Sequence, residues 1–204
     1  MPNAWVKERK REYYYRKAKE EKFRSRASYK LLQAVKKYNF IKHGYVVVDL
    51  GASPGGWTQA ARKLVDDSGF VLAVDLKPIE PVDAPNVRTI VGDVAEPQII
   101  KDILEFLPRS ADVVVSDVSP NVSGIWELDH ARQIDLASQS LRIATSILRS
   151  GGNFFVKVFQ GSSINNFVDE VRQCFSFVKL VKPRASRSKS AELYVLGMNF
   201  RKKK

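Results

Sequence analysis

Short apolar runs alternate with amphipathic stretches along most of this chain. The runs are rich in valine, phenylalanine and leucine and are bounded by glycine, proline or polar residues, which is typical of β-strands. We expect strands over residues 45–49, 70–75, 87–91, 112–117, 153–159, about 175–181 and 192–199. Helical spacing of apolar residues predicts helices over 26–39, capped by Ser25, and over 57–66, 97–106, about 129–149 and 163–173.

This alternation predicts an α/β fold, with helices on both faces of one mostly parallel sheet. The run VVVSD at 113–117 is apolar until its end, as expected of a parallel strand covered on both faces. Gly151 and Gly152 should end the long helix and start the next strand. Only residues 183–191 separate the last two strands, too few for a crossover helix, so these strands should pair antiparallel.

Residues 45–59, YVVVDLGASPGGWTQ, place a glycine turn between an apolar strand and a helix. This arrangement binds dinucleotides or nucleosides, because glycines let the backbone turn tightly and approach a ligand. The turn lacks GxGxxG spacing, and Pro54 has no N–H for a phosphate. It therefore favours a ligand without pyrophosphate, such as S-adenosylmethionine (SAM); an ordinary tight turn is the alternative. The candidate cofactor-binding residues here are Gly51, Ser53, Pro54, Gly55, Gly56 and Trp57.

Four predicted strands end in an aspartate or have one just beyond: Asp49, Asp75, Asp93 and Asp117. Ligands of open α/β sheets bind beyond the carboxyl ends of the strands, so these acids should share one rim. Asp75 is placed to bind ribose hydroxyls and Asp93 the adenine amino group. Asp49 would support the methionine end of SAM or the glycine turn, and Asp117 would face the substrate. Helix capping is the alternative role for each.

The positive charge is concentrated at the two ends of the chain. The net charge is +12, of which residues 1–26 carry ten Lys/Arg against four Glu (+6) and residues 179–204 carry nine against one (+8), leaving −2 between them. A polyanion such as RNA is the expected partner, and solvated tails are the alternative. Aromatic residues among the N-terminal cations suit single-stranded bases. We expect a basic arm over 1–24, the main domain over 25–200 and a basic tail over 201–204.

Composition excludes several other classes of protein. The single Cys174 allows no internal disulfide, and two histidines, His43 and His130, make a Cys/His zinc site unexpected, so we predict no metal. No apolar run has the ~20 residues of a membrane helix, and the N-terminus is charged rather than signal-like. We expect a cytoplasmic protein, and nothing in the sequence requires more than a monomer.

Several segments together resemble one enzyme family. LGASPGGWTQ, VVVSDVSPNVSG and FFVKVFQG, supported by RASYKL and SAELYVLG, are similar to the FtsJ-type, or RlmE-like, ribose 2′-O-methyltransferases over residues 23–200. The resemblance implies a seven-stranded SAM-methyltransferase fold with a reversed last strand, SAM as cofactor and RNA as substrate. It also implies a catalytic set of Lys30, Asp117, Lys157 and Glu192. Bacterial members modify a uridine of large-subunit rRNA, and eukaryotic relatives include tRNA anticodon-loop enzymes.

The chemistry of 2′-O-methylation suits these four residues. A ribose hydroxyl must lose its proton, and a lysine of ordinary pKa, ~10.4, takes up a proton only if burial or a second ammonium lowers that pKa. Lys157 lies in a core strand, NFFVKVF, and is predicted to act as general base or to stabilise the alkoxide. Lys30 would orient the hydroxyl or help lower the pKa of Lys157. Asp117 would hold Lys157 and, as a cofactor-binding residue, help position the methyl donor. Glu192 would hold Lys30 or a ribose hydroxyl. The alternative is a buried Lys–Asp pair and two surface charges.

The segment after the fourth strand favours a hydroxyl acceptor. Amino-group methyltransferases carry an Asn/Asp-Pro-Pro-aromatic element there, whereas this chain has DVSPN at 117–121. Asn121 and Ser123 would line an RNA pocket or a plain turn, and Trp126 would stack on a base or serve as core or lid. The basic loop 184–190 would clamp phosphates or have no role. The rival classes are a non-catalytic RNA-binding assembly factor and a nicotinamide-dependent oxidoreductase.

Overall fold

The computed structural model describes residues 13–187 and 190–202. Its centre is one seven-stranded sheet with the strand order β3-β2-β1-β4-β5-β7-β6. The strands are β1 (Val46–Leu50), β2 (Phe70–Asp75), β3 (Val87–Val91), β4 (Ala111–Ser116), β5 (Leu148–Phe159), β6 (Phe175–Val181) and β7 (Glu192–Phe200). Strands β1 to β5 run parallel to one another, and β7 runs antiparallel to both β5 and β6. The predicted fold, including the reversed last strand, is confirmed.

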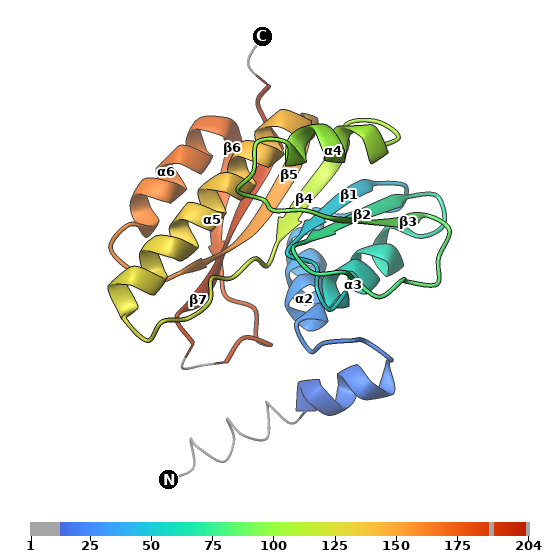
Figure 1. Cartoon of the computed structure of the whole chain (residues 1–204), viewed down its shortest axis with the longest axis horizontal. Helices are drawn as coiled ribbons and strands as arrows, with labels where there is room; N and C mark the ends of the chain where they lie inside the picture. The colour runs from blue at the N-terminus through green and yellow to red at the C-terminus, as the bar shows by residue number, and fades with distance from the viewer. Residues whose placement is uncertain (1–12, 188–189, 203–204) are drawn as a thin grey trace.

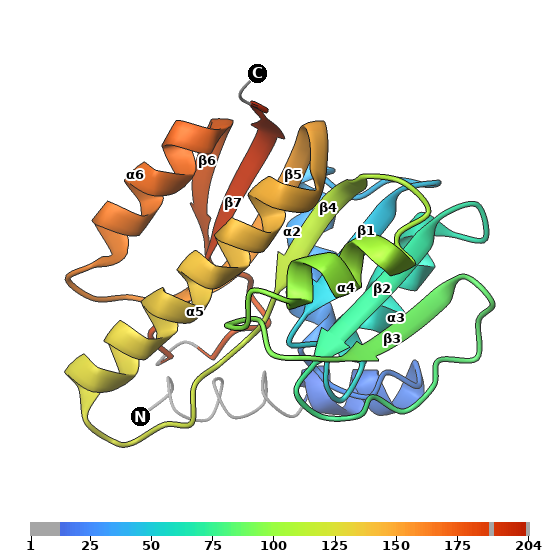
Figure 2. The same cartoon turned by 45° about the horizontal axis from the view of Figure 1, so that its top comes forward.

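Helices cover both faces of the sheet (Figures 1 and 2). Those of one face are α4 (Ile99–Phe106), α5 (Trp126–Ile147) and α6 (Ile164–Cys174), and those of the other are α2 (Ser28–Tyr38) and α3 (Gly56–Val65). Because side chains alternate along each strand, β5 sends Phe154 into the first layer and Phe155 into the second. An apolar layer therefore packs on each face of the sheet, and polar groups lie at the edge where the strands end.

Two expected boundaries differ from the structure. Helix α2 begins at Ser28, after a turn in which the Ser25 hydroxyl accepts a hydrogen bond from the backbone N–H of Ala27 at 3.0 Å. Gly151 and Gly152 lie inside β5 and do not end α5, which stops at Ile147. The β4–β5 register jumps between the pair Ala111–Leu148 and the pair Val113–Asn153. The glycines therefore occupy a bulge at the start of the strand.

The N-terminal segment is partly helical and rests against the domain. Residues 13–20 form a helix, while residues 1–12 of the expected basic arm, with Trp5, lie outside the described part of the chain. Ala18 of this helix packs with Tyr29 and Ala185. Within the described ranges, no helix is long and apolar enough to cross a membrane.

Candidate active site

The loops after β1 and β4 meet at the carboxyl rim of the sheet. These two strands are neighbours, but their loops lead to α3 and α5 on opposite faces, which makes this point the crevice where α/β sheets bind ligands. Gly51 has a φ of +72°, and a Cβ there would lie 2.7 Å from Cγ2 and 2.8 Å from the backbone N of Val118. The glycine therefore allows close packing of the two loops.

The other glycines of the turn make room for the chain itself. A Cβ on Gly55 would lie 2.6 Å from a guanidinium nitrogen of Arg24, and one on Gly56 would lie 2.9 Å from the hydroxyl of Ser25. Arg24 donates hydrogen bonds to the backbone oxygens of Pro54, Glu80 and Pro81 at 3.3, 2.5 and 2.7 Å. This cation of the basic N-terminal region therefore fastens the glycine turn to the loop after β2.

Trp57 lies in the core. Its side chain is 3% exposed, stacks on Phe155 and donates its indole N–H to the backbone oxygen of Ala27 at 2.8 Å. The indole of Trp57, for which we expected a role in cofactor binding, thus packs between the sheet and α2.

Three of the four predicted acids converge on the glycine turn. Asp75 accepts the backbone N–H groups of Ser53 at 2.9 Å and Lys77 at 2.8 Å. Asp49 is fully buried and accepts the Thr58 hydroxyl through one oxygen at 2.7 Å, while its Oδ1 has no hydrogen-bond partner in the described part of the chain. Burial raises the pKa of Asp49 to about 8, and the charges of Asp117 and Asp75 add to the rise, against the Thr58 hydrogen bond. The turn therefore sits in a concentration of carboxylates.

Asp93 lies apart from these three along the rim. It follows β3, and its carboxylate accepts the backbone N–H of Ala95 at 2.9 Å. This contact closes a local turn and is not a helix cap, because α4 begins only at Ile99. The second carboxylate oxygen of Asp93 makes no hydrogen bond within the described residues.

The structure brings Lys30, Asp117, Lys157 and Glu192 together as two ion pairs. Nζ of Lys157 is 3.3 Å from Oδ1 of Asp117 and donates to the Asp117 backbone oxygen at 2.6 Å. Nζ of Lys30 is 2.7 and 2.8 Å from the two oxygens of Glu192. Lys157 is 6% exposed. These residues come from α2, the end of β4, β5 and β7, so the fold alone makes them neighbours.

Tyr194 links the two ion pairs. Its hydroxyl donates to Oδ1 of Asp117 at 3.0 Å, and Nζ of Lys30 lies 5.9 Å from the centre of its ring. The ring is fully buried and stacks on Phe155 at 4.8 Å. Burial raises the pKa of Tyr194 well above its usual value, and the negative charges of Asp117 and Glu192 raise it further, so the hydroxyl stays a donor.

Tyr194 was not among the predicted site residues. Strand alternation could have found it, since it stands two residues after Glu192 and therefore on the same face of β7.

Glu192 is also held from the basic loop between β6 and β7. Burial alone would raise its pKa, but the charge and hydrogen bond of Lys30 and the hydroxyl of Ser186 hold that pKa below its usual value. Ser186 donates to Oε1 of Glu192 at 2.9 Å. The neighbouring Ala185 N–H donates to the side-chain oxygen of Gln33 in α2 at 3.0 Å, and the Gln33 amide donates to the Tyr14 hydroxyl at 2.8 Å. The loop is thus anchored to α2 and, through Gln33, to the N-terminal helix.

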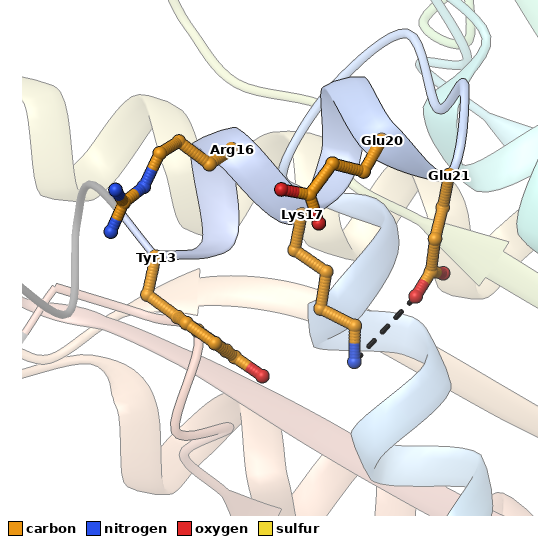
Figure 3. Close-up of a pocket in the computed structure, with 5 residues that line it drawn as sticks. All are labelled: Tyr13, Arg16, Lys17, Glu20 and Glu21. Atoms are coloured by element: carbon orange, nitrogen blue, oxygen red, sulfur yellow. Dashed lines mark ion pairs between the residues drawn. The ribbon is translucent and has the colours of Figure 1, made fainter.

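A hollow of about 320 Å³ lies on the N-terminal helix rather than at the rim (Figure 3). Lys17 and Glu21, four residues apart in its lining, form an ion pair of 3.6 Å. Among the described residues two cations and two acids line it together with Tyr13, so these charges balance and do not favour an anion. Within residues 13–187 and 190–202, no group of three or more His, Cys, Asp or Glu side chains is arranged to hold a metal ion.

Comparison with known proteins decides the family. The sequence profile of the FtsJ-like methyltransferases matches residues 23–200. The chain belongs to the FtsJ-like methyltransferase family. It is 48% identical over 203 residues to ribosomal RNA large subunit methyltransferase E of Methanocaldococcus jannaschii, covering 98% of this chain and 83% of that protein. The protein of the same name from Methanosarcina mazei is 52% identical over 192 residues, covering 94% and 70%.

Solved structures of methyltransferases share the fold of this FtsJ-like chain. A ribosomal RNA methyltransferase from Plasmodium falciparum superposes with a TM-score of 0.77 at 27% identity, covering 87% of this chain and 98% of that one. Fibrillarin of Aeropyrum pernix, solved with bound SAM, has a TM-score of 0.60 at 14% identity, covering 86% and 75%, and shows the fold alone. The resemblance drawn from the sequence motifs is confirmed.

Proposed function

We propose that this protein transfers the methyl group of SAM to a ribose 2′-hydroxyl in large-subunit ribosomal RNA, with a uridine as the target nucleoside. Relatives at 48% and 52% identity carry the name ribosomal RNA large subunit methyltransferase E. The observation that carries the proposal is the assembly of Lys30, Asp117, Lys157 and Glu192 beside the glycine turn, whose Gly51 packs against Val118, the residue after Asp117. In a non-catalytic assembly factor, nothing would require two lysines to be held at this rim.

The rim suits a cationic nucleoside. Asp49, Asp75 and Asp117 lie close enough for the charges of the latter two to raise the pKa of the first. A sulfonium and an ammonium beside these carboxylates lower the electrostatic cost of bringing them together. Asp75 would hold the ribose diol of SAM and Asp93 its adenine amino group, while Asp49 and the turn from Gly51 to Gly56 would support the methionine end.

Lys157 and Asp117 are the residues that would act on the proton of the 2′-hydroxyl. When bound, SAM supplies a methyl group on a sulfonium sulfur, which is an electrophile. Lys157 Nζ acts on the 2′-hydroxyl in one of two ways: as an amine it takes the proton and becomes an ammonium, and as an ammonium it stabilises the developing alkoxide by a hydrogen bond. Asp117 stabilises that ammonium through both contacts seen in the structure, the carboxylate at 3.3 Å and the backbone oxygen at 2.6 Å. An ammonium has three N–H donors, so one remains directed to the substrate oxygen.

The second ion pair orients the substrate in this proposal. Lys30, fixed by Glu192, offers its remaining donors to the ribose, and Tyr194 holds Asp117 through its hydroxyl. We keep residues 25–200 as the methyltransferase domain and residues 1–24 as a basic arm that binds RNA phosphates. The protein would act as a monomer in the cytoplasm.

Methyl transfer from tritiated SAM tests the proposal. The acceptors are large ribosomal subunits, free large-subunit rRNA and bulk tRNA, and the labelled ribose is then mapped. We expect label at a uridine 2′-oxygen of the large-subunit RNA. Label in tRNA alone would establish the anticodon-loop alternative, and SAM and RNA binding without label would establish the assembly factor.

Two lysine variants test the assignment of Lys157. Lys157→Ala should abolish the product while SAM still binds by calorimetry. Lys36→Ala, which removes an exposed lysine from the last turn of α2, should methylate as the parent protein does. Parental turnover in Lys157→Ala would refute the role of Lys157.

A further inference from the structure

The loop between β4 and α5 exposes apolar side chains beside the catalytic residues. Val122 is 71% exposed, Ile125 59% and Trp126 45%. Exposed groups of large apolar side chains are unfavourable in water and commonly mark a binding surface. The loop begins at Asp117, so this surface starts at the residue that holds Lys157.

Trp126 packs on two aromatic side chains, and one of them lies next to the catalytic residues. Its ring lies 6.0 Å from that of Phe159 and 6.3 Å from that of His130, at interplanar angles of 24° and 21°. Phe159 faces Glu192 across the β5–β7 pair, and Lys157 faces Tyr194. Residues opposite each other, or two apart in a strand, share a face of the sheet. Trp126 thus packs on Phe159, which lies on the same face of the sheet as Lys157 and Glu192.

The loop is held in place by hydrogen bonds. Asp129, 2% exposed, accepts the N–H of Ser123 at 2.8 Å, the hydroxyl of Ser123 at 2.7 Å and the N–H of Gly124 at 3.1 Å. These hydrogen bonds, the backbone N–H of Ser123 first, hold the pKa of Asp129 below its usual value, so it accepts them as a carboxylate. His130 is fixed as well, because its Nε2 accepts the backbone N–H of Ser163 at 3.1 Å. The exposed tryptophan is therefore preorganised.

We propose that Trp126 is the stacking platform for a nucleobase of the substrate RNA adjacent to the ribose that is methylated. This inference rests on the proposed function and adds one way in which the substrate RNA is bound. A base has a flat apolar face that an exposed indole can cover, whereas the sugar and phosphate must remain near Lys30 and the basic residues. Stacking on an aromatic side chain suits single-stranded or splayed nucleotides and tolerates any base.

Steady-state methylation of free large-subunit rRNA, measured with tritiated SAM, is the first test. A stacked base contributes ~1–3 kcal/mol, which is about 5- to 150-fold in affinity. Trp126→Leu keeps apolar bulk but removes the flat ring, so its KM for RNA should rise by that factor at a nearly constant kcat. Trp126→Phe keeps a ring and should recover most of the loss. Phe106→Leu is the matched control, since Phe106 is 48% exposed on α4, and it should leave KM unchanged.

Fluorescence gives an independent second test. In a Trp5→Phe background the remaining tryptophans are the buried Trp57 and the exposed Trp126. A ten-nucleotide oligouridylate should quench the emission, and an abasic oligonucleotide of equal length should not. SAM affinity and the unfolding temperature, measured for every variant, separate a loss of stacking from a loss of folding.

Three results would overturn the inference. They are an unchanged KM in Trp126→Leu, equal quenching by the abasic oligonucleotide, and a defect seen with assembled subunits but not with free rRNA. The last would show that a ribosomal protein occupies the surface. If the parent protein methylates no RNA at all, the proposed function fails instead, and the quenching experiment still decides whether Trp126 binds a base.

Discussion

Replacing Tyr194 with phenylalanine isolates the contact that joins the two ion pairs. The variant keeps the ring, which is fully buried against Phe155, and removes only the oxygen that donates to Asp117 at 3.0 Å. A hydrogen bond to a charged group contributes ~1.5–3 kcal/mol. The Asp117 side chain is 19% exposed, so water replaces part of the lost bond. We therefore expect a cost of about 1–2 kcal/mol.

We expect this free energy to be lost from the transition state of methyl transfer. Asp117 loses one of the groups that orient it towards Lys157, so kcat should drop about 5- to 30-fold, at 1.36 kcal/mol for each factor of ten. The assay is single-turnover methyl transfer from tritiated SAM at saturating RNA, with SAM affinity measured by calorimetry on the same samples.

Tyr38→Phe is the control, because it removes a hydroxyl from the far end of α2. If Tyr194→Phe melts at a lower temperature but keeps the parental kcat, the tyrosine only supports the fold, and the argument that it positions Asp117 is refuted.

Three further predictions follow from other contacts. Lys157→Met should lower kcat by about 10²- to 10⁴-fold in single-turnover assays without loss of SAM binding; parental kcat would contradict this. Folded Asp49 keeps its proton up to about pH 8, whereas the unfolded chain loses it near 3.8. The ligand-free protein should therefore lose stability as pH rises between these values. Asp49→Asn should flatten that slope in melts from acid to alkaline pH, and an unchanged slope would implicate another group. Ser186→Ala should lower kcat about fivefold by loosening Glu192, with recovery in Ser186→Thr; failure of threonine to restore kcat would argue for backbone disturbance.

Most of the sheet followed from the sequence, because buried parallel strands appear as short apolar runs between turns. The start of β5 did not. A pair of glycines such as Gly151 and Gly152 is typical of a helix end. In the structure Leu148 already pairs with Ala111, so the strand begins before the glycines. The glycines lie in a bulge that forms only because β4 pairs on both sides of it. Local composition carries no information about such a partner.

The four catalytic candidates were found by motif, but their pairing with Tyr194 required the structure. Glycine positions show the same limit. The sequence indicates that Gly55 and Gly56 need space, whereas only the fold shows that Arg24 and Ser25 occupy it. Trp57 likewise follows the glycine turn in sequence, and only the structure shows that its indole packs on Phe155, which lies far away along the chain.

The sheet order β5-β7-β6 has a consequence for biosynthesis. During translation β6 leaves the ribosome before β7, yet its only neighbour in the sheet is β7, which inserts between it and β5. A nascent chain that stops at β6 therefore leaves the edge of β5 open and β6 unpaired, a state prone to non-native association. Since Glu192 and Tyr194 arrive with the same late strand, a chain still being synthesised cannot methylate prematurely.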